Sequence, residues 1–306
     1  MNRPRRWVTF GVAAGLFAAI AIHLARTQDE VATVSRLSIE LLSAAFVLQF
    51  VSQIFLNGSL LLPLRQVTRV GFWELYLVRT GGFFAGSLVP VAGGLAVRLA
   101  YLRGRGLTYL DFTWATLFSN VLALGAAALL AVVATGALWL MAGPPPVAVL
   151  GVSGAVLAVS LAAAAAFEYL PRLTRHPKLS KWRRLSEMSS LKASRPLAVR
   201  VFGYSFARHV LNFVTFGLLY RSLSGTSGDF LAGGLVYALT SPVRMINVTP
   251  GNLGVTEWFV ALAGKLVAFD VATGLIVSLA FRGVALVAQG VGAVFGLAWI
   301  RFRNKP

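Results

Sequence analysis

Four arginines and one glutamate lie in stretches of sequence that are otherwise almost entirely apolar. Arg208, Arg244 and Arg282 each interrupt a hydrophobic segment, Arg98 ends the run VPVAGGLAV, and Glu257 directly follows TPGNLGVT. A charged side chain inside a membrane segment costs roughly 2.5–3.5 kcal/mol, so such residues face a protein interior or a water-filled cavity. Because a guanidinium binds phosphate or carboxylate through paired hydrogen bonds, these residues predict an anion-binding site. Glu257 would either pair with an intramembrane arginine, Arg282 or Arg244, or carry a coupled proton.

The elements that position these residues are interrupted hydrophobic segments. The interruptions are made by Pro90, Gly93, Gly94, Pro250, Gly251 and Gly254. Irregular backbone at membrane depth persists only where protein or a wet cavity satisfies its polar groups. A helix that restarts at about Asn252, or near Gly93, leaves its first N–H groups unpaired, and such helix ends bind phosphate. We therefore expect Asn252 to belong to the site. Ordinary loop turns between packed helices are the alternative.

The composition indicates a polytopic membrane protein. Of 306 residues, 57% are hydrophobic and 12% are charged, whereas soluble domains carry about 25% charged residues. Spanning helices are predicted for residues 7–25, 37–64, 107–140, 147–167, 197–219 and 271–300. These runs lack the period-two alternation of membrane barrels. The absence of cysteine excludes disulfides and thiolate metal sites, and no residue pattern indicates a metal site or a cofactor.

The basic residues select a topology. They cluster at residues 3–6, 65–69, 98–105, 172–195 and 301–305, and basic loops stay cytoplasmic. If residues 71–89 crossed the membrane, the third and fourth clusters would lie outside. We therefore predict that 71–89 enter, turn at SLVPVAGG and return through 94–103. The cytoplasmic location of these basic clusters explains the formal net charge of +18, so no nucleic-acid partner is expected.

The second half has a matching break, with apolar segments 230–248 and 255–268 on either side of PGNLG. The basic residues are compatible with two full crossings here as well as with a re-entrant pair. The resemblance between the halves favours the re-entrant pair, because Pro90 precedes Asp111 by nearly the same spacing as Pro250 precedes Asp270, and each acidic residue introduces a long apolar run. We predict an all-α polytopic membrane protein with about six transmembrane helices and two re-entrant helical hairpins in an inverted repeat, an arrangement found in many transporters. The expected parts of this single domain, 1–306, are 1–36, the first repeat 37–140, the linker region 141–196, the second repeat 197–300 and the tail 301–306.

The stretches LVPVAGGLAVRLAYLRGRGLT and TPGNLGVTEWFVALAGKLVAFDVATGLIVSLAFRGVAL resemble the lysylphosphatidylglycerol synthase transmembrane region, also called the flippase-like or UPF0104 family. The similarity covers roughly residues 37–300. Membership would imply translocation of a lipid. In larger relatives this region is thought to move an aminoacylated phospholipid made by a separate synthase domain. The sequence ends soon after its last apolar run, so no aminoacylation is expected.

The resemblance also implies site residues. Pro90, Gly93, Gly94 and Arg98 correspond to the first motif, and Pro250, Gly251, Gly254, Glu257 and Arg282 to the second. Leu95 stands where the family commonly has an acidic residue, and Thr256 where it often has a basic one. The long helix of the first repeat has Ser119 and Asn120 where an arginine is frequent. These departures concern the identity of the substrate more than the fold.

The expected function is translocation of an anionic phospholipid or lipid-linked intermediate across the plasma (inner) membrane, with both termini cytoplasmic and no catalytic residue. Its binding residues would be Arg98, Arg208, Arg244, Asn252, Glu257 and Arg282. One alternative is a non-transporting scaffold that recruits a cytoplasmic lipid-modifying enzyme through the basic linker. The other is an intramembrane serine protease that uses Ser153 of GVSG with His209 as base, a motif that small residues also produce where helices pack closely.

Overall fold

The computed structural model describes residues 3–27, 37–88, 93–173, 194–224, 229–245, 249 and 252–303. These residues form helices and contain no strand, which confirms the all-α prediction. The long helices coincide with the six predicted apolar runs to within a few residues. They are α1 (Arg3–Arg26), α3 (Ile39–Leu64), α6 (Tyr109–Ala142), α7 (Val147–Leu173), α9 (Arg195–Ser224) and α12 (Val271–Arg303).

Four of these helices, α3, α6, α7 and α12, are long and apolar enough to cross a membrane. Their outer faces carry large apolar side chains that no part of the described structure covers. On α12, for example, Val294, Phe295 and Trp299 are each more than half exposed. Exposed apolar surface of this extent marks a membrane or partner interface.

Shorter helices form two further pairs. The first pair is α4 (Phe72–Leu88) with α5 (Gly93–Arg103), and the second is α10 (Asp229–Thr240) with α11 (Val255–Leu266). Between α10 and α11 the described residues include a short 3₁₀ turn, η3 (Val243–Met245). The apolar segment 230–248 is therefore not one helix. Pro242 explains the break, because proline lacks an N–H group and disfavours the helical conformation of the residue before it.

The helices α11 and α5 begin close to the positions predicted for them. Helix α5 begins at Gly93, as expected. Helix α11 begins at Val255 and not at Asn252, because Asn252 and Gly254 adopt φ angles of 59° and 80°. Positive φ is incompatible with a right-handed helix. Pro90, Pro250 and Gly251 lie outside the described residues.

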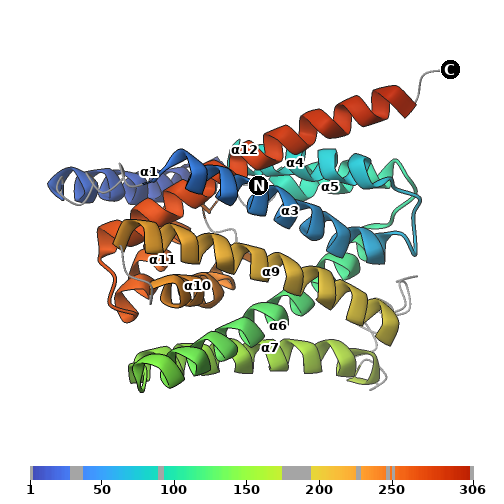
Figure 1. Cartoon of the computed structure of the whole chain (residues 1–306). Coiled ribbons are helices and arrows are strands. Elements are labelled where there is room, and N and C mark those ends of the chain that lie inside the picture. The colour runs from blue at the N-terminus through green and yellow to red at the C-terminus, as the bar shows by residue number, and fades with distance from the viewer. Residues whose placement is uncertain are drawn as a thin grey trace.

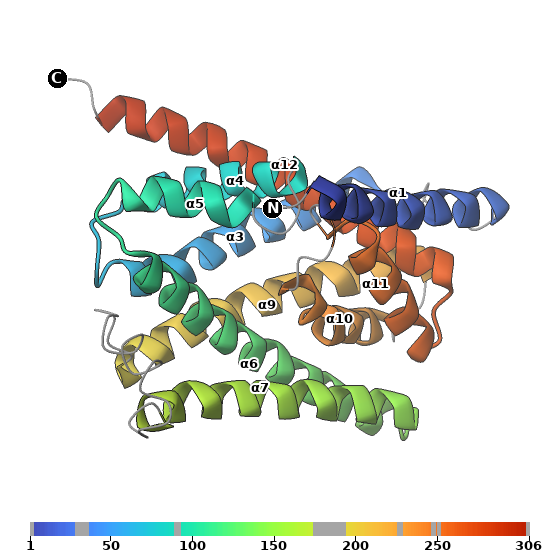
Figure 2. The same cartoon turned by 180° about the vertical axis from the view of Figure 1, so that it is seen from behind.

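The two short pairs are attached at opposite ends of the bundle. In both views the turns from α3 to α4 and from α5 to α6 lie at one end, and the turn from α11 to α12 lies at the other (Figures 1 and 2). Helix α9 runs through the middle of the molecule, where it packs against α3 and α10. Helices α6 and α7 pair along one edge.

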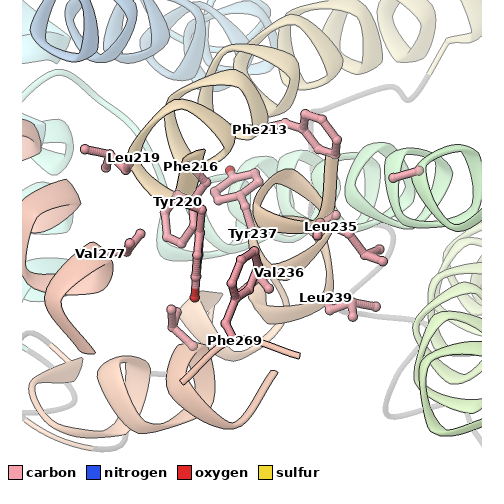
Figure 3. Close-up of a cluster of buried hydrophobic side chains, with 14 of the residues drawn as sticks. Phe213, Phe216, Leu219, Tyr220, Leu235, Val236, Tyr237, Leu239, Phe269 and Val277 are labelled. Atoms are coloured by element: carbon pink, nitrogen blue, oxygen red, sulfur yellow. The ribbon is translucent and has the colours of Figure 1, made fainter. Parts of the chain in front are cut away.

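The main core gathers around α9, α10 and α12. Figure 3 shows the rings of Phe216, Tyr220 and Tyr237 grouped between these helices. Glycines allow α9 and α10 to approach closely. A Cβ atom at Gly233 would lie 2.6 Å from the Cβ of Tyr220, and one at Gly234 would lie 2.3 Å from the Phe213 ring. Small residues at helix contacts are the usual means of close packing in membranes.

Candidate functional site

A polar cavity of about 400 Å³ lies between the two short helix pairs and the long helices α3, α9 and α12. Ligand pockets commonly have volumes of about 300–1,000 Å³. Five arginines line the cavity, and each comes from a different element. They are Arg79 of α4, Arg98 of α5, Arg208 of α9, Arg244 of η3 and Arg282 of α12.

The structure brings most of the residues expected in the site together. Arg98, Arg208, Arg244, Asn252 and Arg282 all line the cavity. Gly94 of the first motif lines it as well. Glu257 is fully buried behind the wall, where it contacts Arg282. Gly254 stands directly before α11 and does not line the cavity.

The first turn of α11 is held in place by Glu257 and Asn252. The Glu257 Oε2 atom accepts a hydrogen bond of 2.7 Å from the backbone N–H of Gly254, which satisfies one of the donors left open at a helix start. The Asn252 side chain donates to the carbonyl of Val243 at 3.0 Å, so it ties the turn before α11 to η3. Asparagine tolerates the left-handed conformation better than most residues. This geometry explains why a polar, glycine-rich stretch interrupts the apolar sequence here.

Glu257 and Arg282 form an ion pair, with 2.7 Å between Oε1 and Nη2. The glutamate side chain is 1% exposed and the arginine side chain is 21% exposed. Arg282 also donates to the backbone carbonyl of Asn252 at 3.4 Å. Of the two partners left open by the sequence, Arg282 is the one that Glu257 contacts. The pair fixes one edge of Arg282, while the residue still lines the cavity.

Arg244 is surrounded by aromatic rings. Its guanidinium carbon lies 4.8 Å from the ring centroid of Phe216, 5.3 Å from that of Tyr237 and 5.0 Å from that of Phe281. Such contacts stabilise a cation by about 0.5–2 kcal/mol each. Its Nε and Nη2 atoms are nevertheless buried without a hydrogen-bond partner among the described residues. An acceptor supplied by a ligand would relieve that cost, which is about 1–3 kcal/mol per donor.

Arg79 is a cavity residue that the sequence-based site lacked. Its guanidinium donates to Gln53 Oε1 at 3.2 Å and to Asn57 Oδ1 at 3.4 Å. The step of four from Gln49 through Gln53 to Asn57 predicts one polar face on α3, but the sequence favours hydrogen bonding between helices as the role of that face. Gln49 and Gln53 in fact line the cavity. The available signal for Arg79 was a lone arginine in an apolar segment, the same signal that identified Arg244.

A buried hydrogen-bond network lies behind the cavity. Asn212 accepts from Gln49 at 2.8 Å and from Ser52 at 2.9 Å, and it donates to the Tyr237 hydroxyl at 2.9 Å. The same hydroxyl lies 2.9 Å from Nδ1 of His209. The network joins α3, α9 and α10. It holds Tyr237 and Asn212, both of which line the cavity.

The network also bears on the protease alternative. His209 is engaged with Tyr237 on α10, whereas the Ser153 hydroxyl lies 3.0 Å from the Thr135 hydroxyl on α6. No hydrogen bond among the described residues joins Ser153 to His209. A nucleophile and its base must lie within hydrogen-bond reach, so the structure contains no such dyad.

Other charged residues of the apolar segments have structural roles. Asp111 accepts from the Thr108 hydroxyl at 2.6 Å while its N–H donates to the same oxygen, which caps α6. Glu74 accepts from the N–H of Gly71 and from the Tyr101 hydroxyl, and it pairs with Arg105. The Tyr101 hydroxyl and the Glu74 carboxylate raise the pKa of the Arg105 guanidinium. These contacts tie the start of α4 to the end of α5 and to the turn that follows it.

The family can be assigned from a comparison with known families. The profile described as the lysylphosphatidylglycerol synthase TM region matches residues 7–292. The chain belongs to this family. The match spans both short helix pairs and all five arginines of the cavity. No curated protein matches the chain. Together with the apolar helices, membership in the lysylphosphatidylglycerol synthase TM region family makes the chain an integral membrane protein related to lipid handling.

Proposed function

We propose that the protein translocates an anionic phospholipid or lipid-linked intermediate across the bilayer, and that it does so without catalysing a covalent reaction. The observation that carries the proposal is the cavity lined by five arginines from five elements. Guanidinium groups are suited to phosphate because they offer paired donors. Among the described residues, Glu257 is the one carboxylate that contacts these arginines, so an anionic ligand would offset their remaining positive charge.

The lengths of the short helices support a path for a headgroup. With a rise of about 1.5 Å per residue, the 11 residues of α5 extend roughly 16 Å, and the 12 residues of α10 and of α11 extend roughly 18 Å each. The hydrocarbon core is about 30 Å thick, so none of these helices crosses it alone. Each pair would enter from one side and turn back within the membrane. The two pairs would enter from opposite sides, as an inverted repeat.

The helix starts inside the membrane add to the positive field. Gly94 of the first turn of α5 lines the cavity, as does Thr256 of the first turn of α11. Their N–H groups carry the positive end of the helix dipole, which favours an anion. In the proposed mechanism the headgroup passes along the cavity while the acyl chains remain in the bilayer. The membrane would be the plasma (inner) membrane, and both termini would be cytoplasmic, as the basic clusters require.

Removing one cavity arginine tests this function. Arg208→Gln deletes a charge from the cavity without breaking any ion pair of the described residues, whereas Arg200→Gln deletes the same charge from an exposed position on the same helix. In proteoliposomes with a headgroup-labelled anionic phospholipid, we expect Arg208→Gln to lower translocation at least tenfold. Arg200→Gln should keep the wild-type rate. Wild-type protein no faster than empty vesicles would contradict translocation and favour the scaffold.

Arg282 needs a different design because of its ion pair. Arg282→Ala alone should abolish translocation, but it leaves the Glu257 carboxylate buried and unpaired, which is strongly destabilising. The double variant Glu257→Gln with Arg282→Gln removes both charges together. We expect the double variant to fold and to be inactive. An active double variant would remove Arg282 from the translocation site.

A further inference from the structure

The charges of the cavity are far from balanced. Five guanidinium groups line it, and Glu257 is the one carboxylate that contacts any of them within the described structure. This leaves a net formal charge of +4.

Three of the five arginines, Arg79, Arg98 and Arg244, are held by neutral groups that leave their charge intact. Arg79 is bound by the neutral amides of Gln53 and Asn57, and Arg98 donates through Nε to the Gly94 carbonyl of its own helix at 3.1 Å. Arg244 lies among aromatic rings. Among the described residues, no carboxylate pairs with Arg79, Arg98, Arg208 or Arg244. Neutral partners orient a guanidinium without cancelling its field.

The positive charges also act on one another across the cavity. The charge of Arg79 is repelled by Arg98 and Arg208, and that of Arg244 by Arg282 and Arg208. Arg208 therefore links two groups of arginines, one from the first short helix pair and one from the second half of the chain. Like charges in a protein interior repel strongly. The arrangement is therefore most stable when a bound anion contacts both groups of arginines.

We propose that the cavity selects a phosphate headgroup with at least two negative charges, such as a lipid phosphomonoester or diphosphate, over a singly charged phosphodiester. The proposal rests on the translocation function proposed above. A phosphodiester offers one charge and two free oxygens, so it engages one group of arginines and leaves the other repelling. A phosphomonoester carries about −1.5 to −2 at pH 7 and three acceptor oxygens. A diphosphate places two phosphoryl groups side by side and reaches both groups of arginines.

Binding of short-chain lipids to the full protein in detergent tests the selectivity. The probes are dihexanoyl phosphatidic acid, dihexanoyl phosphatidylglycerol and a short isoprenyl diphosphate, with inorganic pyrophosphate as the lipid-free control. We expect the phosphomonoester and the diphosphate lipid to bind at least tenfold more tightly than phosphatidylglycerol. Arg208→Gln should reduce this ratio, and Arg200→Gln should not. Equal or tighter binding of phosphatidylglycerol would overturn the proposal.

Two further measurements are decisive. One distinguishes a lipid ligand from a free anion, and the other distinguishes the charge selectivity from the translocation function. If pyrophosphate binds more tightly than the diphosphate lipid, the site prefers a free polyanion, which would contradict a lipid substrate. Proteoliposomes with labelled phosphatidic acid and labelled phosphatidylglycerol give the second separation. Equal translocation of both lipids keeps the translocation function and refutes the charge selectivity. Translocation of neither refutes the function, whereas a binding preference measured in detergent still supports the multiply charged ligand.

Discussion

At the scale of single residues, Tyr237 joins the cavity to the buried network behind it. Its hydroxyl contacts both Asn212 and His209, each at 2.9 Å. In Tyr237→Phe the ring beside Arg244 remains, but a buried amide N–H and a buried imidazole nitrogen lose their partner. Each such loss costs about 1–3 kcal/mol. We therefore expect a clear fall in the temperature of unfolding of the purified protein, measured by intrinsic fluorescence.

The same chain provides a matched control in Tyr220. Its hydroxyl is buried without a hydrogen-bond partner among the described residues. Removing an unsatisfied polar group is close to neutral or stabilising, so Tyr220→Phe should unfold at or above the temperature of the unmodified protein. Similar destabilisation by both variants would mean that the Tyr237 hydroxyl contributes nothing specific.

The Glu257–Arg282 pair permits a second residue-scale prediction. In Glu257→Gln an amide oxygen still accepts from the Gly254 N–H, but the negative charge beside Arg282 is lost. Breaking a buried pair from one side costs about 3–5 kcal/mol, and we expect about 3 kcal/mol because Arg282 is partly exposed. Urea unfolding of Glu257→Gln, of Arg282→Gln and of the double variant measures the coupling free energy between the two side chains. Additive effects in the double variant would show that the pair is not coupled.

The cost of intramembrane charge explains which residues could be predicted and which could not. It requires Arg208, Arg244 and Arg282 to face inward, and it applies equally to Arg79. It does not say which of several inward-facing arginines share one cavity, because that depends on how α4, α9 and α12 rotate and pack. The positive φ of Asn252 could not be predicted either. Pro250, Gly251 and Gly254 indicate that the helix is interrupted, but they do not specify the backbone angles of the interruption.

At the scale of elements, the close contact between α4 and α5 sets the position of Arg98. A Cβ atom at Gly82 would lie 2.8 Å from the Gly94 carbonyl oxygen and 3.1 Å from Cγ of Arg98. Gly82→Ala should therefore push α5 away from α4, at an overpacking cost of about 1–3 kcal/mol. We expect slower translocation of labelled lipid in proteoliposomes and a lower unfolding temperature.

The neighbouring glycine isolates the effect of packing from that of helix propensity. Gly81 is exposed, and a Cβ atom there would meet nothing within 4 Å. Replacing glycine by alanine inside a helix gains up to about 1 kcal/mol, so Gly81→Ala should be neutral or stabilising and fully active. Loss of activity in Gly81→Ala as well would show that the hairpin responds to flexibility and not to the contact with Gly94.

The limits of the elements were largely readable from the sequence. Basic clusters and apolar run lengths located the long helices, and Pro90, Gly93 and Gly94 located the start of α5. The end of α10 at Thr240 was harder to predict, because residues 230–248 are apolar throughout and only Pro242 marks the interruption. Apolar sequence of this kind is compatible with one helix or two.

At the scale of the whole molecule, the two short helix pairs are joined to the bundle at opposite ends (Figure 1). An inverted repeat within a membrane requires these ends to face opposite compartments. The absence of cysteine in the sequence makes the arrangement directly measurable. Single cysteines can be introduced at Tyr109, which is 65% exposed beside the α5–α6 turn, and at the exposed Asp270 before α12.

We expect a membrane-impermeant maleimide to label Tyr109→Cys only from the cytoplasmic side and Asp270→Cys only from the outside, because the basic cluster 98–105 stays cytoplasmic. Right-side-out and inside-out vesicles, each labelled before and after permeabilisation, separate the two cases. Labelling of both positions from one side would place both hairpins on the same leaflet. The arginines of the two halves would then not surround a passage from one leaflet to the other, and the cavity would have to be a binding site open to a single side.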